Sequence, residues 1–369
     1  MHNPDHSQDV SAGEVLAPYL HARAADFLRG LRLHGESGSD TAGAEEAART
    51  LRGAARRISG TLHTFRPLLD TAWADQLRTE LVWLSGTLAV EQACTSRLFR
   101  LVDALSRLSN GTGGPSPVIG TTSGRGASKG AGGGGTVTRP ASGAIGAPGA
   151  GPAPGPVPAA RGSESAGLTV GAARAGALLE RQLTLARTRA HSASLQALGS
   201  ARFHAVADAV ALLASEVPLG PVGTAPAVEV LDGPAELAER RLLDAVAALP
   251  LTRAAHPYNA EALALAAGEG QDAPWHHTRL LLRLHRYATE ALHTGGEPDS
   301  VLYEAARALD RHRDAAEAAS AAAAAARTPR IAPATAYALG VLHADQRHEV
   351  EAARFAFQRA WRRTTAPVP

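Results

Sequence analysis

The stretch "WADQLRTELVWLSGTLAVEQACTSRLFRLVDALSRL", residues 73–108, decides the class of fold. Its apolar residues recur every three or four positions over roughly ten helical turns, and they do not alternate with polar residues as in a half-buried strand. The one candidate strand is the short segment "PAVEVL", residues 226–231. The sequence therefore predicts an all-α fold. Further segments with helical spacing are 13–33, 48–65, 177–198, 201–217, 235–249, 275–296, 301–330 and 334–363.

The composition predicts a folded chain with a core of small aliphatic side chains. Of the 369 residues 45% are apolar but only 4% are aromatic, so Ala, Leu and Val must build the core. The single cysteine, Cys94, excludes a disulfide within the chain and a cysteine-based zinc or iron–sulfur site. The chain starts without a signal-peptide pattern and has no apolar run of eighteen residues, so we expect a cytoplasmic protein with no membrane contact.

Composition also divides the chain. Residues 1–10 are expected to be a disordered tail, and residues 109–166 a disordered insertion, because Gly, Pro, Ser and Ala cannot offset the entropy of ordering. The helical segments 11–108 and 167–365 then form the first and second halves of one domain. The Gly-rich run around Lys129 does not have the spacing of a phosphate-binding loop.

Positive charge is concentrated in "ARTLRGAARRISGTLHTF", residues 48–65, which contains no acid. At about 100° per residue its basic side chains gather on one helix face, opposite the apolar residues. A merely solvated face usually mixes signs, so this one-signed stripe suggests a binding surface. The residues on it are Arg49, Arg52, Arg56 and His63, with Arg57 beside them.

The same spacing recurs in "WHHTRLLLRLHRYATEAL", residues 275–292, again without an acid until Glu290. Two helices with the same stripe suggest an internal duplication. Converging stripes would form a positively charged groove that binds polyanions with salt-sensitive affinity. The basic residues of this second stripe are His276, Arg279, Arg283 and Arg286.

These two helices give the chain a resemblance to the CHAD family, the conserved histidine α-helical domain. The first motif and its following turn are similar to "ARTLRGAARRISGTLHTFRPLL", residues 48–69. The second motif is similar to "WHHTRLLLRLHRY", residues 275–287. The opening and closing helices also resemble those of the family, so the resemblance covers nearly all of 11–365 except the insertion.

The resemblance implies a helical bundle of two pseudo-repeated halves around a basic cavity. It implies non-catalytic binding of inorganic polyphosphate and an association with polyphosphate granules. No cofactor and no metal are expected. The implied polyphosphate-binding residues are Arg49, Arg52, Arg56, Arg57, His63, His276, Arg279, Arg283, Arg286 and His312.

The chain departs from the family pattern mainly in its first half. Arg49 stands where the family has a histidine, and Ser59 stands where it has an arginine. Residues 88–98 lack the arginine–aspartate pair of the family, whereas residues 309–318 keep His312 and Asp314. The second half is therefore expected to be the better preserved part of the site.

Other interpretations have less support in the residues. Fifteen histidines invite a metal site, but no spacing brings three or four ligands together. Cys94 is expected to be a buried structural thiol, and the acids of 310–317 are expected to pair with Arg311 or Arg313. A degenerate bundle that binds a protein partner, through the insertion, remains an alternative. Nucleic-acid binding is disfavoured because the basic stripes have no interleaved aromatic residues for stacking. Phosphohydrolysis is disfavoured because the sequence shows no carboxylate cluster to hold magnesium.

Overall fold

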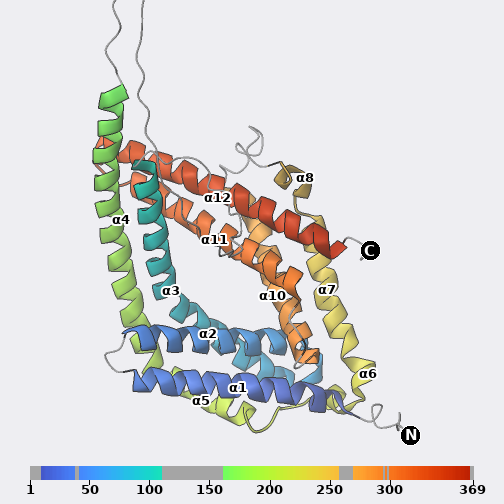
Figure 1. The fold of residues 1–369 in the computed structure, drawn as a ribbon. Helices are drawn as coiled ribbons and strands as arrows, with labels where there is room; N and C mark the ends of the chain where they lie inside the picture. Colours follow the sequence, from blue (N-terminus) through green and yellow to red (C-terminus); the bar gives the residue numbers. More distant parts are fainter. Residues whose placement is uncertain are drawn as a thin grey trace, which may run out of the picture.

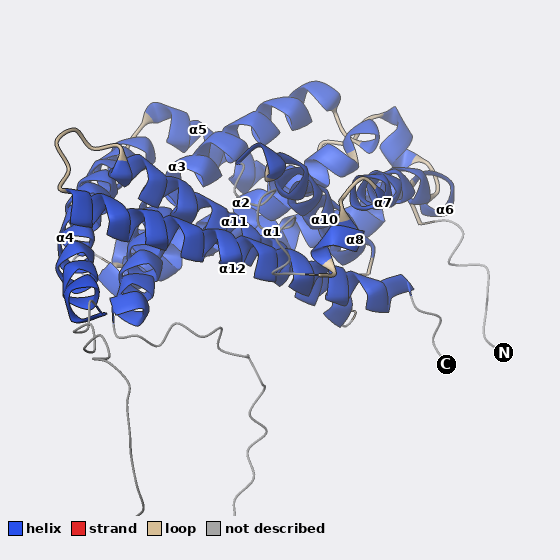
Figure 2. Cartoon of the chain, turned by 90° about the horizontal axis from the view of Figure 1, so that it is seen from above, coloured by secondary structure: helices blue, strands red, loops and turns tan. Residues whose placement is uncertain are grey.

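The computed structural model describes residues 10–37, 41–109, 161–256, 269–293, 296 and 299–365. Helices make up almost all of this part of the chain, and its only β pairing is two isolated bridges, so the all-α prediction is confirmed (Figure 2). The 1–9 part of the predicted tail and residues 110–160 of the predicted insertion lie outside the described residues. The main helices are α1 Ala12–Glu36, α2 Thr41–Thr64, α3 Thr71–Ser109, α4 Arg161–Leu198, α5 Ala201–Leu213, α7 Asp232–Ala247, α10 Ala273–Leu292, α11 Ser300–Ala326 and α12 Pro333–Thr365.

The one candidate strand is helical. The "PAVEVL" segment is not a strand, because Ala227–Val230 forms the short helix α6 and Asp232 opens α7 directly behind it. Among the described residues, only the start of the segment pairs with another part of the chain. Pro226 forms an isolated antiparallel bridge with Ser11, and the backbone N–H of Ala227 donates to the carbonyl of Val10 at 2.9 Å. Short apolar runs do not distinguish a strand from a helical turn by spacing alone.

The two halves repeat the same order of helix contacts. In the first half α1 packs on α2, α2 on α3 and α3 on α4; in the second α7 packs on α10, α10 on α11 and α11 on α12. The halves meet where α4 contacts α12 and α2 contacts α10. Figure 1 shows the result, in which α2, α3, α11 and α10 follow one another around the middle of the molecule.

This order corrects the predicted division of the chain. Residues 167–365 were expected to form the second half, but α4 packs along α3, and α5 packs on α1 and α3, so both belong with the first half. The segment 109–166 therefore interrupts the first repeat and does not separate the repeats. Helix α4 begins at Arg161, so residues 161–166 of that segment are helical. Gly and Pro content indicates an insertion but not its place in a repeat.

The core is built from Leu, Ala and Val, as the composition predicted. One cluster joins α1, α2, α3 and α5, a second joins α7, α10, α11 and α12, and a third lies between α3, α4, α11 and α12. The third contains alanines on every facing surface, which lets the helices approach closely. Cys94 is buried, in agreement with its predicted structural role.

The stripe-bearing helices α2 and α10 cross in direct contact. A Cβ on Gly60 of α2 would lie 2.6 Å from Cδ2 of Tyr287 on α10, which is too close for any real Cβ. Only glycine allows this approach, and it sets the distance at which the two basic faces stand from each other.

Candidate functional site

A cavity of about 580 Å³ opens between α2, α3 and α11. Five arginines line it against two acids, and none of its lining residues is aromatic. Its volume lies within the range of ordinary ligand sites. The lining residues are Arg52, Arg56, Ala89, Val90, Gln92, Ala93, Cys94, Ser96, Arg97, Arg100, Arg313, Asp314 and Glu317.

Arg52 and Arg56 are one helical turn apart on α2 and face this cavity half-buried. The Nε atom of each is buried without a hydrogen-bond partner among the described residues. Burial, together with the charges of the neighbouring Arg56 and Arg313, lowers the pKa of Arg52 to about 10. The pKa of Arg56 is lowered for the same first reason, burial. Both side chains stay charged at neutral pH, so an anion bound here would relieve a real electrostatic cost.

Arg279 and Arg283 of α10 approach the same group of cations. Burial lowers the pKa of each, and each also lowers the pKa of an arginine on α2: Arg283 that of Arg52, and Arg279 that of Arg56. Unlike the α2 pair, they form ion pairs with an acid: Arg279 Nε donates to Asp310 Oδ1 at 2.5 Å. Arg283 lies 3.7 Å from the same oxygen. The structure thus brings two predicted residues from each repeat together.

Three other predicted arginines are engaged elsewhere. Arg49 is exposed and pairs with Glu46 within its own helix. Arg57 donates from Nε to Glu290 at 3.0 Å, and a guanidinium nitrogen of Arg286 lies 3.7 Å from the same carboxylate. None of these three lines the cavity.

His63 lies past the crossing of α2 and α10, near the end of α2. Burial lowers its pKa, and Arg78 and Arg241 lower it further. Its neighbours are therefore α3 and α7 residues, and it is separate from the cavity arginines. The α2 stripe predicted from sequence is divided by the helix that crosses it at Gly60.

His312 lies in a buried ionic network behind the cavity. Its ring stacks on Trp275 and meets His276 edge-on, with ring centres 5.6 Å and 5.3 Å away. Its Nε2 lies 3.4 Å from Asp272 Oδ1, and Arg354 Nε donates to it at 3.3 Å. Burial lowers the pKa of His312 to about 4, so the ring is neutral at pH 7.

Asp272 is the centre of this network. It accepts two hydrogen bonds from Arg347, at 2.7 and 3.1 Å, and one from Arg354 at 2.8 Å. Burial alone would raise the pKa of Asp272, but His312, 3.4 Å away, and the hydrogen-bonded Arg347 hold it below its usual range. The network therefore fixes the start of α10 to α11 and α12.

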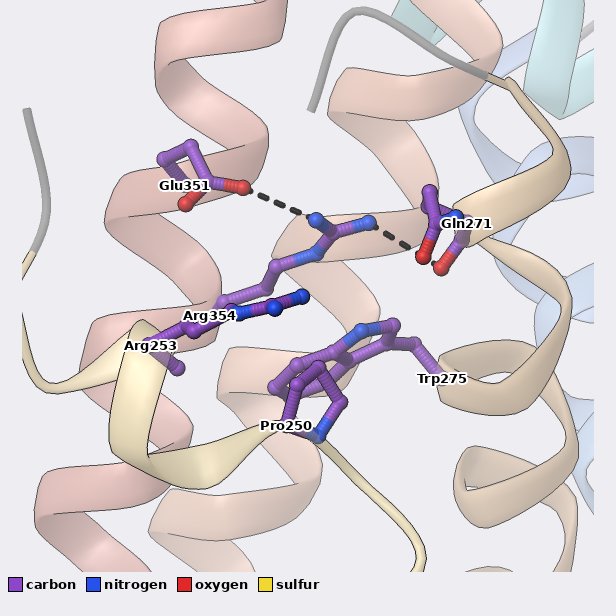
Figure 3. A pocket seen from close by; sticks show the side chains of 7 residues that line it. Pro250, Arg253, Gln271, Trp275, Glu351 and Arg354 are labelled. Atoms are coloured by element: carbon purple, nitrogen blue, oxygen red, sulfur yellow. Dashed lines mark hydrogen bonds and ion pairs between the residues drawn. The ribbon is translucent and has the colours of Figure 1, made fainter. Parts of the chain in front are cut away.

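A small pocket of about 20 Å³, the size of one water, lies beside this network. Figure 3 shows the Arg354 guanidinium between the Glu351 carboxylate and the Gln271 backbone, close to Trp275. The Arg354 guanidinium also lies 5.2 Å from the centre of the Trp275 ring. The charged residues Glu351 and Arg354 that line it are already paired with each other, so the pocket is a packing feature of the network.

Sequence reasoning missed several residues of the cavity. Arg97 and Arg100 come from α3 and were not predicted, because residues 88–98 lack the family motif. Arg313 was expected to pair with a nearby acid, and it does donate to Asp314 at 3.0 Å, but it also faces the cavity. The i, i+3 spacing of Arg97 and Arg100 was a signal. Their convergence with α2 depends on the fold.

Two kinds of feature are absent from the described residues. No group of three or more His, Cys, Asp or Glu side chains there is arranged to hold a metal ion. No helix in that part of the chain has the length and apolar content needed to cross a membrane.

The family model of the CHAD domain matches residues 22–301, so the chain belongs to the CHAD domain family and the resemblance is confirmed. Among solved structures, the chain is similar to PptA from Streptomyces chartreusis. The two are 53% identical with a TM-score of 0.70, and the match covers 96% of this chain and 100% of that one. No curated protein matches the chain.

Proposed function

We propose that this chain binds inorganic polyphosphate, without altering it chemically, in the cavity between α2, α3 and α11. The observation that carries the proposal is the pair Arg52 and Arg56, held half-buried among other cations with no ion pair among the described residues. Membership of the CHAD family, for which polyphosphate is the expected ligand, supports it. Association with polyphosphate granules would follow from such binding.

The chemistry of the cavity favours a flexible chain of phosphates. Arginine forks bind phosphate oxygens through charge-assisted, bidentate hydrogen bonds. Arg52 and Arg56 lie one turn apart on α2 and Arg313 faces them from α11, so they can hold successive phosphates without reading any sequence. Nucleic acid is a poorer fit, because single strands are usually held by stacking on aromatic side chains and the cavity lining has none.

A non-catalytic role is part of the proposal. The two acids of the cavity, Asp314 and Glu317, are both engaged, with Arg313 and with Arg97. Neither is placed as a free base or as one of a pair of magnesium ligands. Incubation with polyphosphate should therefore leave the length of the polyphosphate chain unchanged.

Binding titrations with long-chain polyphosphate and with single-stranded DNA, across a salt series, test the proposal. The variant Arg52→Glu/Arg56→Glu should lose about 100-fold or more in polyphosphate affinity, because two charge-assisted contacts are removed. The matched control is Arg174→Glu/Arg181→Glu, which makes the same charge change at exposed positions of α4.

The proposed function fails if the wild type does not bind polyphosphate at low salt. It also fails if both double variants, shown to be folded by circular dichroism, lose affinity equally. Equal affinity for DNA and polyphosphate of matched charge would reduce the site to a general polyanion surface.

A further inference from the structure

Glu290 places one negative charge at the end of the α10 stripe. Its carboxylate accepts hydrogen bonds from Arg57 Nε at 3.0 Å and from the Tyr19 hydroxyl at 3.2 Å. A guanidinium nitrogen of Arg286 lies 3.7 Å away. We call Tyr19, Arg57, Arg286 and Glu290 the Glu290 cluster; it joins α1, α2 and α10.

The cluster lies where the basic stripes would otherwise continue. Along α10, Arg279, Arg283, Arg286 and Glu290 follow at intervals of four, three and four residues, so all share one helix face. Tyr287 lies between the last two, against Gly60 of α2. The sign of the stripe therefore reverses at the point where α10 crosses α2.

Arg57 and the two cavity arginines of α2 are in opposite electrostatic states. Burial lowers the pKa of Arg52 and of Arg56, and neither has an ion pair among the described residues. Burial also acts to lower the pKa of Arg57, but Glu290 and Tyr287 outweigh it and the pKa is raised. Arg57 already has its anion, whereas Arg52 and Arg56 have no ion pair among the described residues.

A phosphate that reached Arg57 or Arg286 would have to approach the Glu290 carboxylate. Like charges at such distances repel, and the side chains here are only about one-third exposed, so solvent screens them incompletely. The arginines Arg57 and Arg286 also stack on Tyr287 and Tyr303, with the guanidinium carbon 5.5 Å from each ring centre. They are held in place with their charge compensated.

We propose that Glu290 limits the stretch of polyphosphate that this protein binds. It neutralises Arg57 and Arg286, and it ends the anion path at the crossing of α2 and α10. The bound chain is then confined to the arginines of the cavity and to the neighbouring Arg279 and Arg283. This inference rests on the proposed function and assigns Glu290 as a residue that determines its length specificity.

The variant Glu290→Gln tests this, because it removes the charge but keeps a group that can accept from Tyr19 and Arg57. The matched control is Glu304→Gln, which removes an acid paired with Arg363 at 2.9 Å, exposed and outside the cavity. Affinity for long-chain polyphosphate and for tripolyphosphate is measured at several salt concentrations, together with the melting temperature.

Glu290→Gln should bind long-chain polyphosphate about tenfold more tightly than Glu304→Gln, as expected for one added charge-assisted contact. The salt dependence should steepen by about one to two phosphate contacts. Affinity for tripolyphosphate, which is short enough to stay in the cavity, should match the control.

Three results would overturn the assignment: equal affinities of the two variants for the long chain, an equal gain for tripolyphosphate, or weaker binding by Glu290→Gln. The last would make Glu290 a residue that positions its arginines for binding. In each of these cases the wild type still binds polyphosphate. Absence of binding by the wild type would instead refute the proposed function and, with it, this inference.

Discussion

At the scale of single residues, the arginines of this protein differ in what already neutralises them. Periodicity could predict which arginines share a helix face, because that depends on local geometry. It could not predict that Asp310 holds Arg279, or that Glu290 holds Arg57, because those partners come from other helices. The first half, which has lost more of the family motif, contains the two cavity arginines with no ion pair among the described residues.

His312 gives a prediction about pH. Its pKa is about 4 in the folded protein, below the 6.5 of a free histidine, so the folded state binds fewer protons than the unfolded state between these values. The contribution of His312 to the free energy of unfolding should therefore be complete above pH 6.5. The free energy of unfolding should then fall as the pH drops from 6.5 to 4. His276, whose pKa is also lowered by burial, acts in the same direction.

Chemical denaturation at a series of pH values measures this effect. In the variant His312→Gln the decrease between pH 6.5 and 4 should be shallower than in the wild type, with the His276 contribution remaining. The explanation is wrong if the two curves run parallel through this window.

At the scale of elements, the sequence could predict which segments form helices, but not which helices pack against each other. The stripes of α2 and α10 were visible as repeated spacing, but their crossing at Gly60 depends on packing between residues more than 200 positions apart. The same holds for Arg97 and Arg100, which face the cavity only because α3 contacts both α2 and α11.

Gly60→Ala should destabilise the protein by about 1–3 kcal/mol, because the new methyl group would overlap the Tyr287 ring. Gly86→Ala is the matched control: Gly86 is inside α3 and a Cβ there meets nothing within 4 Å. That change should stabilise by about 0.5–1 kcal/mol, since alanine favours a helix more than glycine does. Urea denaturation measures both, and similar shifts of the two variants would contradict the close crossing.

At the scale of the whole molecule, two similar sets of helices close a ring in which α2, α3, α11 and α10 each contact the next. Each repeat supplies one stripe helix and one helix that faces it, so the charge of both halves converges in one place. The sequence predicted the duplication and the all-α class. It placed the boundary between the halves wrongly, because the segment 109–166 interrupts a repeat whose later helices, α4 and α5, pack back on α1 and α3.

The most direct test of the central claim is a crystal structure of the protein with bound polyphosphate. We predict electron density for a chain of phosphates in the cavity, with phosphate oxygens within hydrogen-bond distance of Arg52, Arg56 and Arg313. Density for the chain on an outer face such as that of α4, with the cavity empty, would contradict the account.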